Sequence, residues 1–336
     1  MFCRDGTLLS FCMLLLGIGC CPQRALARNA NIKLRSDVSR VESLGLPPGP
    51  TAQLRTAISN HQYRAAERIL LPAIAKSHDP ALRARLLNFT GGVYYLDHDF
   101  LHAAVAWSKS SAIAPLPPTL QFSLAMTYVQ LHRLDWAQPA LQALARQYPR
   151  NALYPYWLGR IEYATHHYNH AIRDFHQAIQ LGPDMANAYD NLGLCYYYLN
   201  ENSKAIVNYK KAIHLNIDSG HPSAWPYLNL AITQEFLNQI PSAQKNLEES
   251  IRLNPNIPSA YFQLGNVLEH SGKLKLAQHE YQAAIDHDAN YAEPHFALAR
   301  IYQRLGEKAR ARNEVHIYMR LRHSKQSTAH RHATGD

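Results

Sequence analysis

The sequence predicts an all-α fold, a solenoid of about eight stacked helix-turn-helix units. Small residues recur every 34 positions with one four-residue offset, and an alanine follows each of them after twelve positions. Apolar residues make up 47% of the 336 residues and charged residues 18%, which permits a sizeable buried core. The small residues are Gly91, Ala125, Gly159, Gly193, Ala231, Gly265 and Ala299, and the alanines are Ala103, Ala137, Ala171, Ala205, Ala243, Ala277 and Ala311.

A large apolar residue stands four positions after each alanine. Apolar residues at helical spacing in both halves of the period predict two antiparallel helices per unit. Proline closes several units because it lacks an N–H and disfavours helix in the residue before it. We expect the small residue of the first helix to face the alanine of the second, and the large residues to fill the space between units. The large residues are Trp107, Leu141, Phe175, Tyr209, Leu247, Tyr281 and Val315, and the prolines are Pro115, Pro149, Pro183 and Pro255.

This pattern resembles the tetratricopeptide repeat, in which Leu-Gly is followed by a Tyr, an Ala, an aromatic residue and a closing Pro. Leucine precedes the small residue at Leu124, Leu158, Leu192, Leu230, Leu264 and Leu298. The resemblance implies a right-handed α-solenoid and covers residues 47–325. The expected units are 47–80, 84–117, 118–151, 152–185, 186–219, 224–257, 258–291 and 292–325, the first of them degenerate.

The first 27 residues have the features of a signal peptide. Residues 7–21 are almost wholly apolar, which is the right length for a signal core and short for a bilayer span. Ala25-Leu26-Ala27 supplies the small-x-small pattern that signal peptidase recognises. We therefore expect an exported, periplasmic protein cleaved after Ala27. An uncleaved anchor, or a lipid anchor on Cys20 or Cys21, remains the alternative.

The segments that flank the repeats are polar. Residues 28–46 are expected to form a polar linker that ends in Pro47-Pro48-Gly49-Pro50. The last second helix, from Lys308 to about His323, is rich in Arg and suits a terminal cap with a polar outer face. Residues 326–336 are expected to be a disordered tail.

The cysteine content bears on possible disulfides, and the net charge bears on the classes of partner that the protein can bind. Four of the five cysteines lie in residues 1–27, so the exported chain keeps only Cys195 and has no internal disulfide. The net charge is +9, and an exported basic protein meets anionic lipids and polymers rather than genomes. Nucleic acid is therefore not an expected partner. The basic C-terminal helix could contact an anionic lipid or polysaccharide, although a solvated cap is the preferred interpretation.

The resemblance implies that the first helices line a concave surface, with positions 2, 5, 9, 12 and 13 of each unit pointing into it. Aromatic side chains on such a surface can hold a peptide, and Asn and Arg can orient it. The competing interpretation is that many of these aromatics pack between successive first helices as core. The candidate partner-binding residues are Tyr95, Phe122, Tyr156, Arg160, Tyr163, Tyr197, Tyr198, Trp225, Phe262, Asn266, Phe296 and Arg300, together with Met126 and Phe236 at the same positions.

Signals for catalysis or metal binding are weak. The chain has no G-x-S-x-G, no H-E-x-x-H and no Gly-rich phosphate loop followed by Lys. Residues 286–297 begin like a calcium loop but lack its Gly and its Glu. His166, His167 and His170 cluster at a predicted turn, where we favour a solvated turn over a Zn²⁺ or Ni²⁺ site. Cys195 fits a buried structural thiol better than a nucleophile. We expect no cofactor.

Together these observations predict a non-catalytic scaffold of the bacterial cell envelope that binds a peptide or protein partner on the concave face. The alternative functions are an adaptor subunit of an envelope enzyme or polysaccharide-export complex, and direct binding of an anionic polymer. A catalytic domain within this chain is not expected, because the repeats occupy residues 47–325 and the signal takes 1–27.

Overall fold

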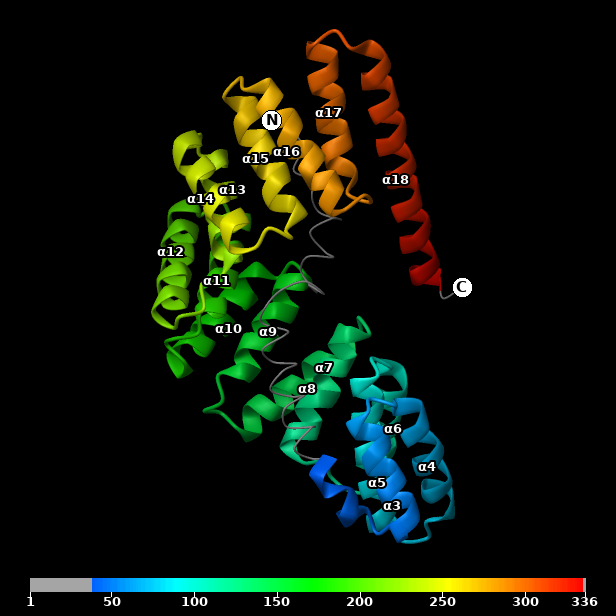
Figure 1. Cartoon of the computed structure of the whole chain (residues 1–336). Coiled ribbons are helices and arrows are strands. Elements are labelled where there is room, and N and C mark those ends of the chain that lie inside the picture. The colour runs from blue at the N-terminus through cyan, green and yellow to red at the C-terminus, as the bar shows by residue number, and fades with distance from the viewer. Residues whose placement is uncertain (1–37, 335–336) are drawn as a thin grey trace. The chain divides into compact units, whose positions relative to one another are not determined.

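The computed structural model describes residues 38–334, and within this range every regular element is helical (Figure 1). This confirms the predicted all-α array of helix-turn-helix repeats. The expected signal segment, with its cleavage site after Ala27, lies outside the described residues. A short 3₁₀ helix, η1 (Val38–Leu44), precedes α3 (Pro48–Ser59), α4 (Tyr63–Lys76), α5 (Pro80–Leu96), α6 (Phe100–Ser111), α7 (Pro118–Gln130), α8 (Leu134–Gln147), α9 (Leu153–Ala164), α10 (Tyr168–Leu181), α11 (Ala186–Tyr198), α12 (Asn202–Asp218), α13 (Ala224–Phe236), α14 (Ile240–Leu253), α15 (Pro258–His270), α16 (Leu274–His287), α17 (Ala292–Arg304) and α18 (Lys308–Thr334).

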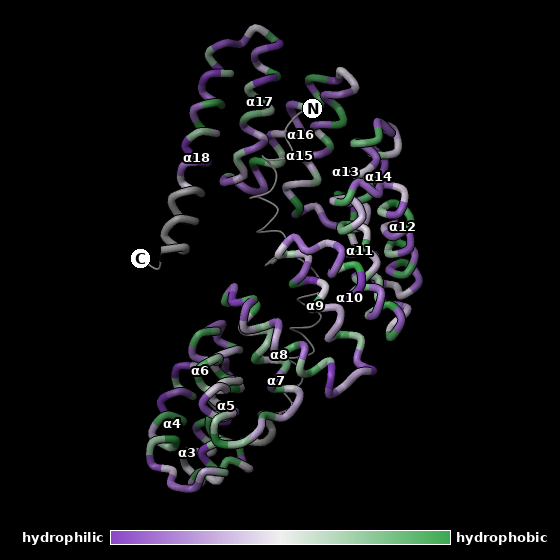
Figure 2. Tube along the Cα trace, turned by 180° about the vertical axis from the view of Figure 1, so that it is seen from behind, coloured by the Kyte–Doolittle hydropathy of each residue, from purple (hydrophilic) through white to green (hydrophobic). Residues whose placement is uncertain are grey.

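The helices form two units that divide between Pro183 and Asp184. Helices α3–α10 build the N-terminal unit and α11–α18 the C-terminal unit. In each unit the odd-numbered first helix packs on its even-numbered partner, and each second helix packs on the first helix of the next repeat. Apolar and polar residues alternate along every helix (Figure 2), so each helix has a face to bury. No helix among the described residues is both long and apolar enough to cross a bilayer.

In four of the repeats an aromatic ring of the second helix packs on a glycine of the first. A Cβ added at Gly265 would lie 2.5 Å from the Tyr281 ring, and one at Gly193 would lie 2.5 Å from the Tyr209 ring. We expected the small residue to face the alanine of the second helix. The structure instead places the large residue four positions further on against it. The same contact joins Gly91 to Trp107 and Gly159 to Phe175.

The periodic alanines and large residues form the core. Ala103, Ala137, Ala171, Ala205, Ala243 and Ala277 are fully buried. The large residues from Trp107 to Tyr281 are also fully buried, which leaves Val315 of the last repeat as the exception, 37% exposed. The core of the C-terminal unit runs without a break from Ala224 to Tyr302, because side chains of neighbouring repeats share it. Burial therefore follows the period of the sequence.

The turn between the two helices of each repeat has one residue with a left-handed backbone. These residues are His61, His98, His132, His166, Asn200, Asn238, Gly272 and Gly306, with φ between 56° and 79°. The next amide N–H closes the turn on a carbonyl five residues back, for example His167 on Glu162 at 2.8 Å. Only Gly adopts this conformation without strain. In six of the eight turns, replacing the left-handed residue by Gly would therefore reduce backbone strain.

Helix boundaries differ from the sequence expectations at three places. Residues 38–44, expected as linker, form η1 because Val41 and Leu44 lie on one side of it and are buried against α3. Asp79 caps α5, which begins at Pro80, four residues before the expected start of the unit 84–117. Helix α18 continues to Thr334, past residue 325, where we expected a disordered tail to begin. No Gly or Pro interrupts residues 308–334, so nothing in that sequence stops the helix.

Candidate functional site

The first helices line one side of the C-terminal unit. Helix α11 contacts α13, and α13 contacts α15, whereas no contact of similar extent joins the second helices α12, α14 and α16. A row of helix pairs bends toward the side on which its helices lie closer together. The first helices are therefore on the concave side of this unit, as the resemblance implies. We call their solvent-facing side chains, at positions 2, 5, 9, 12 and 13 of each repeat, the inner face.

Large aromatic side chains are exposed on this inner face. Phe236 at the end of α13 is 57% exposed, and Phe296 on α17 is 44% exposed. The Phe236 ring meets Tyr197 of α11 edge-on, with 6.3 Å between ring centroids, and Tyr197 in turn meets Tyr198 at 5.6 Å. Phe296 packs on Tyr318 of α18 at 5.1 Å. These rings contact one another but leave apolar surface open to solvent, which is typical of a binding surface.

Trp225 and Phe262 are more deeply placed. Both are half-buried and pack against the core of the C-terminal unit. The Phe262 ring lies 5.7 Å from Tyr281 and 5.4 Å from Tyr291, so it contributes to the joint between repeats. These two residues thus belong at least partly to the fold, as the competing interpretation of the aromatics supposed.

A polar cluster on α15, α16 and α17 borders one of the exposed rings, Phe296, over which the Arg300 guanidinium lies at 5.8 Å. The Tyr281 hydroxyl lies 2.8 Å from a Glu269 carboxylate oxygen and 2.9 Å from the Asn266 amide oxygen, so its single proton is shared between these two acceptors. Arg300 Nη2 donates to the same Glu269 carboxylate at 2.8 Å, and Arg304 lies 3.5 Å from its other oxygen. The arginine side chains are 48% and 52% exposed, so each guanidinium keeps donors directed at solvent. Burial, and then the bond to Glu269, raise the pKa of Tyr281.

One buried and one half-buried carboxyl group lie at inner-face positions of α11 and α13. Asp190 accepts a hydrogen bond of 2.9 Å from Asn229, which ties α11 to α13. Burial raises the pKa of Asp190 to about 7, against the opposing effect of the Asn229 bond. Burial also raises the pKa of Glu235 to about 7. Near neutral pH both groups are therefore only partly ionised, and their charge changes over the physiological range.

The candidate aromatics of the N-terminal unit are mostly inside the fold. Tyr156 and Tyr163 on α9 are 2% and 1% exposed. The Tyr156 ring lies 6.0 Å from Phe175 and 5.7 Å from Trp157. Arg160 is half-buried and stacks over the Trp157 ring at 4.7 Å. Because these side chains contact the repeat core, changes at them act first on stability.

Of the remaining candidates of this unit, Met126 is buried, Phe122 is half-buried at a joint between repeats, and Tyr95 is half-buried within its own repeat. Phe122 on α7 contacts Tyr154 at 5.7 Å, and Met126 on the same helix is 8% exposed. Tyr95 on α5 lies 5.9 Å from Trp107 and 5.5 Å from Phe100. Burial raises the pKa of the Tyr95 hydroxyl. Among the sequence candidates, the exposed ones are thus concentrated in the C-terminal unit.

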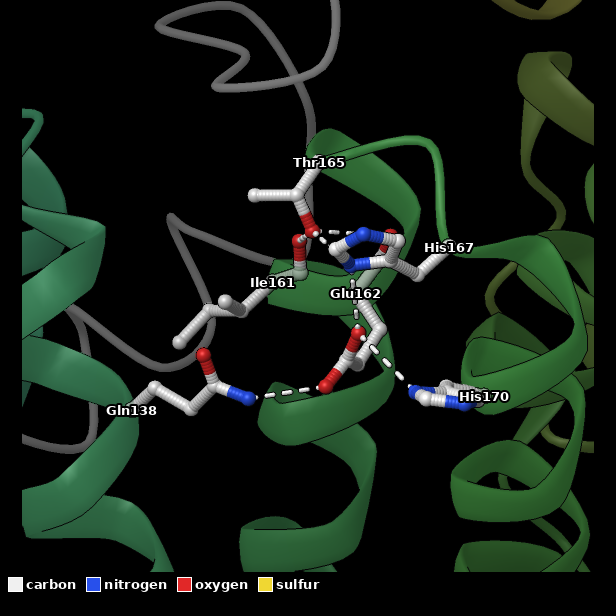
Figure 3. A network of polar contacts seen from close by, with 6 residues as sticks. All are labelled: Gln138, Ile161, Glu162, Thr165, His167 and His170. Atoms are coloured by element: carbon white, nitrogen blue, oxygen red, sulfur yellow. Dashed lines mark hydrogen bonds and ion pairs between the residues drawn. The ribbon is translucent and has the colours of Figure 1, made fainter.

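The histidines at the α9–α10 turn surround a buried glutamate (Figure 3). Gln138 of α8 donates to Glu162 at 2.7 Å, His167 Nδ1 lies 3.0 Å from the other carboxylate oxygen, and His170 lies 3.7 Å from it. His166 instead lies 2.9 Å from the Tyr168 hydroxyl. Across residues 38–334, no group of three or more His, Cys, Asp or Glu side chains is placed to hold a metal ion. The cluster links α8, α9 and α10 through polar contacts.

Sequence reasoning missed the acidic members of the inner face and of this turn. Asp190, Glu235 and Glu269 occupy positions 5, 12 and 12 of their repeats, and Glu162 precedes the histidine turn. An acidic residue at a position otherwise held by large apolar residues was the available signal. Cys195 is fully buried, and burial raises the pKa of its thiol, which disfavours the reactive thiolate.

Known proteins match this chain in its repeats and in its fold. Tetratricopeptide repeat models match residues 122–168, 186–216 and 246–279. No curated protein matches the chain in sequence. Among solved structures, a tetratricopeptide repeat protein from Parabacteroides merdae is similar, with a TM-score of 0.61 and 13% identity over 84% of this chain and 99% of that one.

Two further structures share the fold. The type IV pilus biogenesis factor PilW has a TM-score of 0.54 and 22% identity over 59% of this chain and 90% of its own. PilF of Pseudomonas aeruginosa has a TM-score of 0.53 and 17% identity over 59% and 88%. At such identities the likeness concerns the fold. Together with the matched repeat models and the ring-on-glycine packing of every glycine-bearing repeat, it shows that the chain contains tetratricopeptide repeats and has the fold of proteins built from them.

Proposed function

We propose that the protein is a non-catalytic scaffold of the bacterial envelope that binds a peptide or protein partner on the inner face of its C-terminal unit. The observation that carries this proposal is the exposure of Phe236 and Phe296 on first helices, where they are not needed to fill the core. Exposed aromatic anchors on a preformed surface are the residues that dominate binding energy in many interfaces.

The polar cluster beside Phe296 gives the surface its specificity. Arg300 and Arg304 present guanidinium donors to solvent while Glu269 holds them in place. A partner segment with an aromatic or aliphatic side chain and an acidic group would satisfy both features. Loss of Arg300 should weaken binding more at low salt than at high salt, because the contact is exposed and screened.

The location in the envelope rests on the sequence of residues 1–27. A fusion of residues 1–30 to a reporter that is active only outside the cytoplasm tests it. We expect activity, and we expect the mature chain to begin at Arg28. A chain that begins with a lipidated Cys20 or Cys21 would make the protein membrane-anchored, and a silent reporter would remove the export proposal.

The binding proposal is tested with a partner captured by the full chain from solubilised envelope and identified by mass spectrometry. Phe236→Ala should weaken the complex by about 2 kcal/mol or more, roughly 30-fold in Kd, without lowering the melting temperature. The matched control is Val207→Ala, which also truncates an exposed apolar residue (66% exposed) but on the second helix α12. Equal affinity for the two variants would place the partner elsewhere on the protein.

A further inference from the structure

The last helix differs from every other second helix in length. Helix α18 has 27 residues, against 14 in α14 and α16, and so measures about 40 Å. Its partner α17 has 13 residues and spans about 20 Å. Figures 1 and 2 show α18 running beside α17 and then continuing past its end. A large part of α18 therefore has no helix packed on it among the described residues.

One exposed stripe of α18 combines basic and apolar residues. Lys308, Arg312, Val315, Met319 and Arg322 are separated by four, three, four and three residues, which places them on one face of the helix. Val315 is 37% and Met319 52% exposed. Val315 occupies the position that is fully buried in the six repeats from α5–α6 to α15–α16, so its exposure results from the end of the array.

The charge on this helix is almost entirely positive. Residues 308–334 contain seven Lys or Arg residues and a single carboxylate, Glu314. That carboxylate is directed inward, where it lies 2.7 Å from His295 Nδ1. Just before the helix, Glu307 is bound to Arg310 at 2.8 Å. The outward stripe thus presents mainly cations and apolar groups, and one of the cations, Arg322, lies within electrostatic reach of Glu293 on α17.

We propose that the exposed face of α18 binds the headgroup region of an anionic lipid bilayer. Arg and Lys side chains contact lipid phosphates, while Val315 and Met319 enter the interface between them. The apolar pair at the centre of the stripe favours lipid over a soluble polyanion, which would interact with the charges alone. The stripe lies next to the inner face, because Arg322 donates to the Tyr318 hydroxyl and the Tyr318 ring packs on Phe296, so the protein would hold its partner beside a membrane.

The test compares three variants of the full chain on phosphatidylglycerol–phosphatidylcholine vesicles by sedimentation at low salt. K308Q/R312Q/R322Q should reduce partitioning by about 100-fold, because each charge near an anionic surface contributes a factor of about five. V315S/M319S should reduce it several-fold. The control K210Q/K211Q/K245Q removes the same net charge from exposed positions on α12 and α14, and should leave partitioning nearly unchanged.

Residues 7–21 can also enter lipid, so the site needs a local measurement. Hydrogen exchange with and without vesicles should slow in peptides from 308–334 and not in peptides from α12 or α14. The proposal is overturned if both triple variants lose vesicle binding equally, or if 308–334 gains no protection. It is also overturned in favour of a polyanion if dextran sulfate binds α18 as tightly and V315S/M319S changes neither interaction.

Discussion

Gly265→Ala tests the ring-on-glycine packing that is found in four of the repeats. The new methyl group would lie 2.5 Å from Cε1 and 2.6 Å from Cδ1 of Tyr281, whereas ordinary contacts begin near 3.4 Å. The ring has little room to move. Tyr281 is fully buried, and its hydroxyl is fixed by bonds to Asn266 and Glu269. The two helices of this repeat must therefore separate, or the ring must break those bonds.

The expected cost follows from two opposing effects. Overpacking a closed core costs about 1–3 kcal/mol. Replacing a helical Gly by Ala recovers about 1 kcal/mol through lower backbone entropy in the unfolded chain. Because the clash involves two ring atoms of an anchored side chain, we place it at the upper end of its range. The net loss in the free energy of unfolding should be about 1–2 kcal/mol.

Urea unfolding followed by circular dichroism measures this loss against two matched changes. Gly159→Ala should cost less, because its contact with Phe175 is 2.9 Å and that ring has no hydroxyl to anchor it. Gly49→Ala, in the first turn of α3 with nothing within 4 Å, should cost nothing. If Gly265→Ala is as stable as Gly49→Ala, the assignment of Tyr281 to this contact is wrong.

Three further outcomes are expected. His166→Gly should stabilise the protein by about 1 kcal/mol, because it removes the backbone strain of a non-glycine residue with a left-handed backbone. Gly272→Ala should destabilise the protein by a similar amount. The melting temperature measures both changes. Because the pKa of Asp190 is raised in the folded state, the folded protein binds a proton that the unfolded chain has lost, and the free energy of unfolding should fall as the pH rises from about 4 to 7. Asp190→Asn should remove this loss, which reaches up to about 4 kcal/mol at pH 8. Parallel pH profiles of the two proteins would contradict this. Ala171→Leu should lower the unfolding free energy by about 1–3 kcal/mol, whereas exposed Ala309→Leu should not.

The helix pairs could be predicted from the sequence because their contacts repeat. Each unit must bury a small residue against a large one sixteen positions later, so the pattern is copied wherever the fold is copied. The partner of the small residue could not be obtained in the same way. Ala277 and Tyr281 are both fully buried and both periodic, so spacing alone does not show which of them meets Gly265.

The inner face could be predicted only in part. Its positions follow from the repeat, and Phe236, Phe296 and Arg300 are exposed there. Exposure itself depends on the neighbouring repeat, which is why Tyr156 is 2% exposed at the same position that leaves Phe296 44% exposed. The ends of the array were harder still to predict from the sequence, because η1 and the long α18 do not follow the 34-residue period.

In one repeat the same side chain serves the core and the binding surface, whereas in another repeat different side chains do so. In α15–α16 the Tyr281 ring fills the space beside Gly265, and its hydroxyl also holds the Glu269 carboxylate that positions Arg300. A change at Gly265 should therefore disturb the polar cluster along with stability. In α13–α14 the equivalent core residue is Leu247, which has no hydroxyl to reach the inner face. Phe236 can thus be altered without a direct effect on the core, so it is the position at which binding can be measured apart from folding.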